Sequence, residues 1–288
     1  MADKSSIEWT DATWNPLAGC TKVSPGCANC YAEVMARRLK AMGNINYQGV
    51  VDDKGRWSGQ IALIPSVLDK PLHWKRPRKI FVDSMSDLFH PTVPSGYIRL
   101  VFQAMLEANW HIFQVLTKRP DRMAEVLNGA DWWMRIDPED RKHIWLGTSV
   151  ENQKCAEERI PKLLNTPARV RFLSCEPLLG PLDLSGFLKC LNGDYKTPMI
   201  SWLIAGGESG VKARPMHPNW VTDLRDQCQA AEVAFHFKQW GEWHYDGEVV
   251  KYRPDVPVST ASGWPMYRVG KHTAGRLLDG RTWDEYPR

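Results

Sequence analysis

The stretch Lys79-Ile-Phe-Val-Asp-Ser-Met-Ser-Asp87 begins as an apolar run and ends in polar residues. Five later stretches repeat this pattern: HIFQVLTKR (111–119), HIWLGTSVEN (143–152), VRFLSCEP (170–177), SWLIAGGES (201–209) and FHFKQWGEW (235–243). Nearly continuous apolar runs of this length are typical of strands buried on both faces, as in a parallel sheet covered by helices. The pattern therefore predicts six strands, and residues 7–13 predict a weaker seventh.

Between these runs lie stretches with apolar residues at helical spacing. They cover residues 97–109, 122–127, 152–164 and 219–231. Strand–helix–strand units that repeat in this way form right-handed βαβ crossovers. We therefore expect an α/β fold, a closed or partly open β/α barrel of parallel strands, with a doubly wound open sheet as the alternative. Residues 1–240 would form the barrel, and residues 241–288, which lack clear periodicity, an irregular extension packed on it.

The composition is that of a soluble globular chain, with 288 residues, 43% of them hydrophobic and 24% charged. No apolar run approaches the length of a membrane span, and the first residues lack the apolar core of a signal peptide. We therefore expect a cytoplasmic protein, in which clustered cysteines indicate metal binding or catalysis rather than disulfides. The net charge of +4 permits a phosphate-bearing partner.

Three of the seven cysteines, Cys20, Cys27 and Cys30, share one short loop with C-x6-C-x2-C spacing. A structural zinc site would need a fourth ligand, such as His90 or Cys175. A 4Fe–4S cluster held by three cysteines would leave one iron open to chelate a small molecule such as S-adenosylmethionine. Cys30 also precedes an expected helix whose positive end favours thiolates, and these features favour iron–sulfur over zinc.

A three-cysteine loop after the first strand of a β/α barrel resembles the radical S-adenosylmethionine (radical SAM) superfamily. Within it, WNPLAGCTKVSPGCANCYAE, FVDSMSDLF, FQVLTKRP, LGTSVEN, FLSCEPLLGP, LIAGGESG and FHFKQWGEW are similar to a phage- and prophage-associated three-cysteine family of uncharacterised function. The match runs from about Trp9 to Trp243. Inside the superfamily, the strand ends look most like those of spore photoproduct lyase, a DNA-repair enzyme. The usual superfamily spacing is C-x3-C-x2-C, so the first gap is longer here.

The resemblance implies a barrel of radical SAM type with its site at the carboxyl ends of the strands. Residues expected to contact the cofactor, S-adenosylmethionine, are Ser86, Asp87, Lys118, Ser149, Glu151, Glu176, Gly206, Gly207 and Glu208. Residues expected to contact the substrate are Arg119, Lys212, Arg214, Lys238 and Trp240. The superfamily often binds the cofactor amino group with a Gly-Gly-Glu motif at the second strand, but here that motif follows the sixth, so Asp87 is the candidate for this role.

The candidates on the first strand ends also have purely structural interpretations. Asp87 would otherwise cap the next turn. Lys118 and Arg119, candidates for a carboxylate or phosphate contact, would otherwise be solvated surface cations. Glu151, a candidate for the ribose hydroxyls together with Ser149, would otherwise cap the next helix with its neighbour Asn152.

The later strand ends are ambiguous in the same way. Gly206 and Gly207 would allow a ligand to approach the backbone closely, and Glu176 is expected to bind a ligand. Trp240 either stacks on a base or packs at the end of the barrel. Cys175 is expected in the core, or, if it faced the cavity, it would donate a hydrogen atom to a substrate radical.

Two functions follow from these patterns. The first is a radical SAM enzyme, reduced by an external electron donor, that abstracts hydrogen from a nucleobase or nucleic-acid substrate. The second is a zinc-stabilised β/α protein that binds nucleic acid or a partner without this chemistry.

Overall fold

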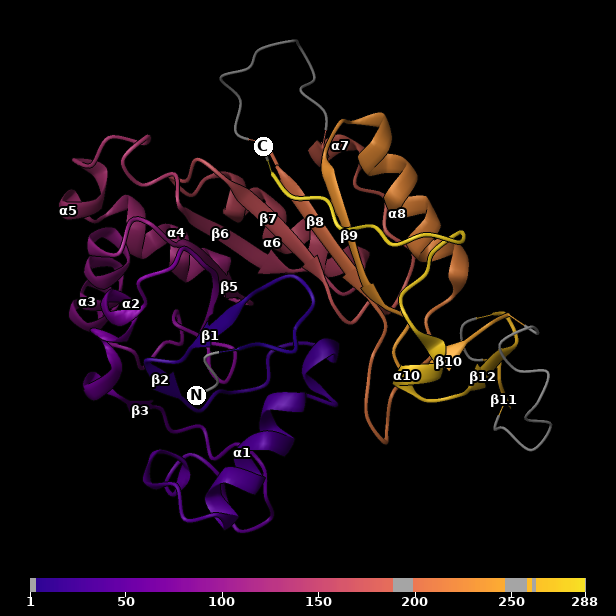
Figure 1. Cartoon of the computed structure of the whole chain (residues 1–288), viewed down its shortest axis with the longest axis horizontal. Helices are drawn as coiled ribbons and strands as arrows, with labels where there is room; N and C mark the ends of the chain where they lie inside the picture. The colour runs from indigo at the N-terminus through magenta and orange to yellow at the C-terminus, as the bar shows by residue number, and fades with distance from the viewer. Residues whose placement is uncertain (1–3, 189–198, 247–257, 261–262, 288) are drawn as a thin grey trace. The chain divides into compact units, whose positions relative to one another are not determined.

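The computed structural model describes residues 4–188, 199–246, 258–260 and 263–287 (Figure 1). The chain divides into two compact units. The first contains residues 1–148 and 162–171, and the second contains residues 149–161 and 172–288. Among the described residues, no helix is both long and apolar enough to cross a membrane.

The first unit is built on four parallel strands. They are β1 (Ala12–Trp14), β4 (Lys79–Val82), β5 (Ile112–Thr117) and β6 (Ile144–Ser149). Their order in the sheet, β1-β4-β5-β6, follows their order along the chain. Nearly every residue of β4, β5 and β6 is buried, which explains the continuous apolar runs in the sequence.

Helices and short elements connect these strands. The helices are α1 (Tyr31–Ala41), α2 (Lys70–His73), α3 (Ser95–Glu107), α4 (Pro120–Asn128) and α5 (Asp131–Met134). The segment between α1 and β4 contains η2 (Ile45–Tyr47), η3 (Pro65–Val67) and β3 (Ala62–Leu63). β3 pairs antiparallel with β2 (Leu17–Ala18), which comes just before the cysteine loop.

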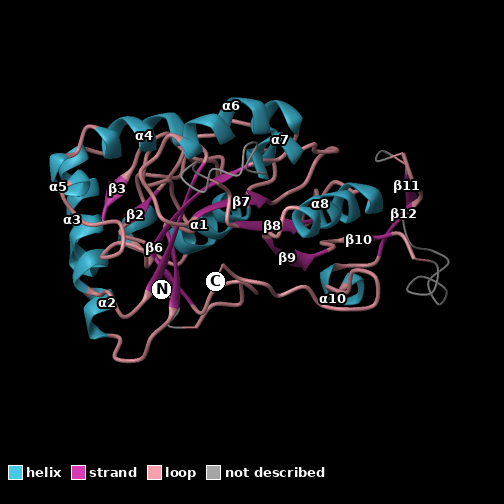
Figure 2. Cartoon of the chain, turned by 90° about the horizontal axis from the view of Figure 1, so that it is seen from above, coloured by secondary structure: helices cyan, strands magenta, loops and turns pink. Residues whose placement is uncertain are grey.

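The second unit contains three further parallel strands. They are β7 (Arg171–Cys175), β8 (Trp202–Gly206) and β9 (Ala234–Gln239), in that order. Helices α7 (Ser185–Leu188) and α8 (Pro218–Ala230) belong to this unit, and α6 (Gln153–Leu164) has its first residues in it and its last residues in the first unit. Figure 2 shows these helices in cyan. Strands β10 (Trp243–His244), β11 (Val258–Ser259) and β12 (Met266–Arg268) form a small antiparallel sheet, followed by α10 (Lys271–Ala274).

The strand order bears on the predicted architecture. A doubly wound sheet reverses its strand order at a switch point, and neither unit shows such a reversal. Parallel strands that follow chain order and alternate with helices agree with a partial β/α barrel. The fold is therefore mixed α/β, and all six strongly predicted strands are present. The weak strand predicted at residues 7–13 corresponds to β1, which begins at Ala12.

Candidate functional site

The cysteine loop lies at the carboxyl ends of strands in the first unit. Gly19 forms a parallel bridge to Ser86, four residues beyond the end of β4. The loop then passes through η1 (Pro25–Cys27) and reaches Cys30, the N-terminal cap residue of α1. These contacts agree with the predicted position of the loop beside the first strand ends.

Cys20 lies among buried charges. Burial and the charge of Asp87 raise the pKa of its thiol to about 12, although Arg119 opposes this rise by its charge and by a hydrogen bond to the sulfur. The thiol is therefore neutral in the metal-free chain. A bound cation would supply the positive charge that a Cys20 thiolate needs, because ligand thiols deprotonate on metal binding.

Cys30 links the other two thiols electrostatically. Burial raises the pKa of the Cys30 thiol. Hydrogen bonds from backbone N–H groups in the first turn of α1 and the charge of Lys118 oppose this rise. The charge of Cys27 acts on Cys30, and the charge of Cys30 acts on Cys20. The three thiols thus form one electrostatic group, with the end of a helix and two cations available to stabilise negative charge.

Arg119 joins the cysteine loop to the ends of β4 and β5. Its Nη1 donates to Asp87 Oδ2 at 2.7 Å, and its Nη2 donates to Thr21 Oγ1 at 2.7 Å and to the Thr21 carbonyl oxygen at 3.2 Å. Its side chain is buried, so the interpretation as a solvated surface cation is wrong for Arg119. A direct contact with substrate remains a prediction that would require Arg119 to exchange these partners.

Asp87 is engaged on both carboxylate oxygens. Besides Arg119, it accepts hydrogen bonds from Thr117 Oγ1 at 2.6 Å and from the N–H groups of Phe89 at 3.0 Å and Lys118 at 3.3 Å. The capping interpretation is therefore present in the structure, because the bond to Phe89 closes the turn after β4. The predicted contact with the cofactor amino group would have to displace one of these donors.

His90 does not serve as a free fourth ligand. Its Nε2 lies 2.9 Å from Thr21 Oγ1, and its Nδ1 lies 2.9 Å from Thr92 Oγ1. Both ring nitrogens thus have hydroxyl partners, and Nε2 shares Thr21 with Arg119. His90 and Thr21 belong to the framework of the loop, a role that the sequence alone did not indicate.

Asp83, at the end of β4, has the unusual geometry of a site residue. Its φ is +60°, a left-handed conformation, and its side chain is buried. Oδ1 accepts from Ser86 Oγ at 2.7 Å and from the Leu17 N–H at 3.3 Å, whereas Oδ2 is buried without a hydrogen-bond partner. Burial raises the pKa of this carboxyl to about 8. Ser86, predicted to contact the cofactor, here donates to Asp83.

In the second unit, the predicted strand-end carboxylates are each paired with a cation. Glu176 lies 2.6 Å from Lys238 Nζ, and Glu208 accepts hydrogen bonds from the Arg214 side chain on both oxygens, at 2.9 and 2.7 Å. Lys238 and Arg214, predicted to contact substrate, therefore hold carboxylates of their own chain. Lys212, predicted together with them, lies exposed between β8 and α8.

Glu151 forms the third pair. Its completely buried carboxylate accepts from Arg159 Nη1 at 2.9 Å, and the same nitrogen donates to the Ser149 carbonyl oxygen at 2.8 Å. The helix-capping interpretation holds for Asn152, whose Oδ1 accepts from the Cys155 N–H at 3.0 Å. Glu151 instead anchors Arg159, a partner eight residues away that the sequence did not single out.

Of the two glycines at the end of β8, Gly207 has a structural explanation. A Cβ on Gly207 would overlap the carbonyl oxygen of Trp240, and a Cβ on Gly241, whose φ is +85°, would overlap that of Glu208. At Gly207, therefore, the segment after β9 approaches the backbone as closely as a ligand was predicted to do. Around Gly206 the nearest groups are Lys238, Gln239 and Glu176.

Trp240 and Cys175 are core residues. Trp240 is buried, packs edge-on against Phe237 and donates from Nε1 to the Leu277 carbonyl oxygen at 2.8 Å. Packing thus accounts for Trp240, and base stacking does not. Cys175 is fully buried, and after burial the largest influence on its raised pKa is the charge of Cys228 on α8. Cys175 therefore lies toward a helix-covered face, as the core interpretation predicts.

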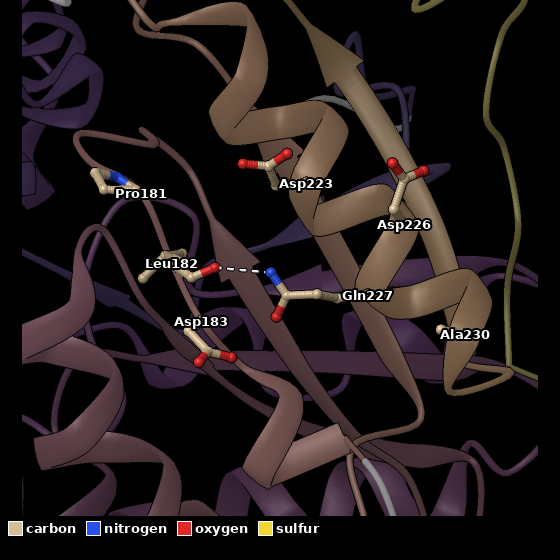
Figure 3. A pocket seen from close by; sticks show the side chains of 7 residues that line it. All are labelled: Pro181, Leu182, Asp183, Asp223, Asp226, Gln227 and Ala230. Carbon is tan, nitrogen blue, oxygen red and sulfur yellow. Dashed lines mark hydrogen bonds between the residues drawn. The ribbon is translucent and has the colours of Figure 1, made fainter.

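The second unit also has a shallow hollow of about 550 Å³ between α8 and the segment before α7 (Figure 3). Gln227 holds its two sides together, donating to the Leu182 carbonyl oxygen at 2.8 Å and accepting from the Leu184 N–H at 2.6 Å. Asp183, Asp223 and Asp226 line it. None of the predicted site residues lines this hollow.

Comparison with known proteins adds a family but no activity. No curated protein and no solved structure matches the chain. One family model, described as a protein of unknown function (DUF5131), matches residues 4–287. Because this match covers nearly the whole chain, the protein belongs to the DUF5131 family.

Proposed function

We propose that this protein is a radical SAM enzyme in which Cys20, Cys27 and Cys30 hold a 4Fe–4S cluster. The observation that carries the proposal is the place of the cysteine loop at the strand ends of the first unit, where Cys30 caps α1 and the buried Arg119 binds Thr21, the residue after Cys20. Thiolate ligands are stabilised by nearby cations and by helix N-termini.

The donor set fits a cluster better than a single ion. Zinc requires its ligands about 2.3 Å from one centre, so its thiolates crowd together. In the part of the chain that the structure describes, no three His, Cys, Asp or Glu side chains converge in this way. A cluster would spread its three thiolates over three irons, so its ligands need not meet at one centre.

The residues around the thiols would orient the cluster and offset its charge. Arg119 holds Thr21, the residue after Cys20, while Asp87 fixes the guanidinium in place. Cys30 lies where the first N–H groups of α1 point at its sulfur. The cluster, when bound, would supply an electron to S-adenosylmethionine and so start radical chemistry at a carbon–hydrogen bond of the substrate.

The substrate is proposed to carry a nucleobase. The net charge of +4 and the resemblance to a repair enzyme support this class. The ion pairs of Lys238 with Glu176 and of Arg214 with Glu208 argue against phosphate contacts at those cations. A base-bearing small molecule is therefore favoured over a polynucleotide.

Anaerobic purification tests the cofactor assignment. We expect a brown protein with about four irons and matching sulfide, whose EPR signal after reduction changes when S-adenosylmethionine is added. Cys30→Ser should lose the iron, whereas Cys228→Ser, a buried cysteine outside the loop, should keep it. A colourless protein that holds one zinc through the same three cysteines would refute the proposal and favour the zinc-stabilised binding protein.

A further inference from the structure

Helix α1 exposes three of its four large apolar residues to solvent, Tyr31, Val34 and Met35, whereas an amphipathic helix usually buries them. Its core-facing positions are Ala32 and Ala36, which pack in a cluster with Tyr47, Val50 and Met85. The partly buried Leu39 also packs against this cluster, whereas the other large apolar residues of α1 are exposed.

We call the exposed apolar residues of α1 and of the segment that leads from it into η2 the α1 strip. Within the helix, Val34 and Met35 come three and four residues after Tyr31, so these three lie on one face, while Met42 and Ile45 follow the end of the helix. The strip and its exposed fractions are Tyr31 52%, Val34 42%, Met35 40%, Met42 79% and Ile45 79%. Surface apolar residues are usually scattered singly, and a contiguous patch marks an interaction site.

The charges beside the α1 strip are positive. Arg38 falls within it at the helical position between Met35 and Met42, and Arg37 flanks it; both are exposed. Among the contacts recorded for the described residues, neither arginine has an ion pair. A partner with an apolar centre and acidic edges would complement this surface.

The aliphatic chemistry of the strip points to a protein partner. Val34, Met35 and Ile45 offer nothing to a phosphate backbone, while methionine adapts well to a protein surface. The α1 strip also starts directly after Cys30, the residue proposed to bind the cluster. An electron that the cluster gives up has to be replaced from outside.

We propose that the α1 strip is the docking surface of a small acidic electron-transfer protein that reduces the cluster. This inference rests on the proposed function. In the step, the donor loses one electron and the cluster gains one, without bond formation or proton transfer. Electron-transfer complexes are small and transient, which suits a strip of one helix and its following turn.

The test compares two reductants on the reconstituted protein. The probe protein is a reduced bacterial flavodoxin, an acidic FMN protein, and the small-molecule control is dithionite. Val34→Glu combined with Met35→Glu should slow reduction by flavodoxin at least tenfold and leave reduction by dithionite unchanged. Leu100→Glu, an equally exposed apolar position on α3, should change neither rate. Reduction of the wild type by flavodoxin should slow as salt rises.

Several outcomes would overturn the inference. These are equal flavodoxin rates for wild type and the double variant, no acceleration over free FMN, or a wild-type dimer that the double variant converts to monomer. Binding of oxidised flavodoxin, followed by fluorescence anisotropy, separates the two proposals because it needs no cluster. Loss of binding in the double variant of a chain that never retains iron would refute the proposed function and leave the docking surface standing.

Discussion

Replacing Asp83 by asparagine should remove most of a pH-dependent loss of stability in the first unit. The Asp83 carboxyl is buried, has a pKa raised to about 8 by burial, and has no hydrogen-bond partner for Oδ2. In the unfolded chain its pKa returns to the ordinary value of about 3.9. Below that value both states are protonated, and the full stability is present. As pH rises toward 8, only the unfolded chain loses the proton, so folding becomes less favourable.

The size of the effect follows from linkage. Each pH unit between the two pKa values costs about 1.4 kcal/mol, so between pH 5 and pH 7 the wild type should lose about 3 kcal/mol relative to Asp83→Asn. Asparagine keeps the two hydrogen bonds accepted by Oδ1 and tolerates the positive φ. The other groups with raised pKa values near this carboxyl, Tyr47 and Tyr97, titrate at about 12, outside this window.

Urea unfolding of the metal-free protein at pH 5, 6, 7 and 8 measures the difference in unfolding free energy between variant and wild type. That difference should grow with pH in favour of the variant. Asp131→Asn, an exposed carboxylate in a surface ion pair, is the matched control and should give a constant difference. A constant difference for Asp83→Asn as well would mean that Asp83 is ionised in the folded chain, and the reasoning would be wrong.

Two further substitutions test the second unit. Gly207→Ala should destabilise it by several kcal/mol, because the new Cβ overlaps the Trp240 carbonyl oxygen. In the control, Gly186→Ala, the new Cβ meets nothing within 4 Å, so stability should be unchanged or higher. Equal melting temperatures for the two variants would contradict the close packing at Gly207. Glu151→Ala should cost about 3–5 kcal/mol by leaving Arg159 buried and uncompensated. Adding Arg159→Met to Glu151→Ala should recover part of that loss in thermal unfolding, and no recovery would show that the charge is not the cause.

The strands could be predicted closely because burial on both faces leaves a continuous apolar signature. The stretch predicted at residues 79–87 illustrates the limit: β4 ends at Val82, where Asp83 takes a left-handed conformation and starts a turn. No local pattern encodes that conformation in a non-glycine residue. The predicted helix ends lie within a few residues of the observed ones; α8, for example, was predicted at 219–231 and is observed at Pro218–Ala230.

The candidate site was less predictable because its chemistry depends on pairing between distant segments. The sequence indicates that Lys238 and Glu176 each lie at the end of a strand, but not that Lys238 Nζ and the Glu176 carboxylate lie 2.6 Å apart. The sequence predicted a substrate contact for Arg119, with a solvated surface cation as the alternative, but it did not indicate the contacts with Thr21 and Asp87. Only the cysteine loop, whose residues are close in sequence, could be located from spacing alone.

The last described residues of the chain protect the outer side of β9. The Phe237 N–H donates to the Trp283 carbonyl oxygen, and the Glu285 N–H donates to the Phe235 carbonyl oxygen. His236 and Asp284 form an antiparallel β-bridge. Without this segment, β9 would present unsatisfied backbone groups on which another chain could add a strand. Truncation near residue 280 should therefore lead to aggregation rather than simple loss of activity, and purification tags are better placed at the N-terminus.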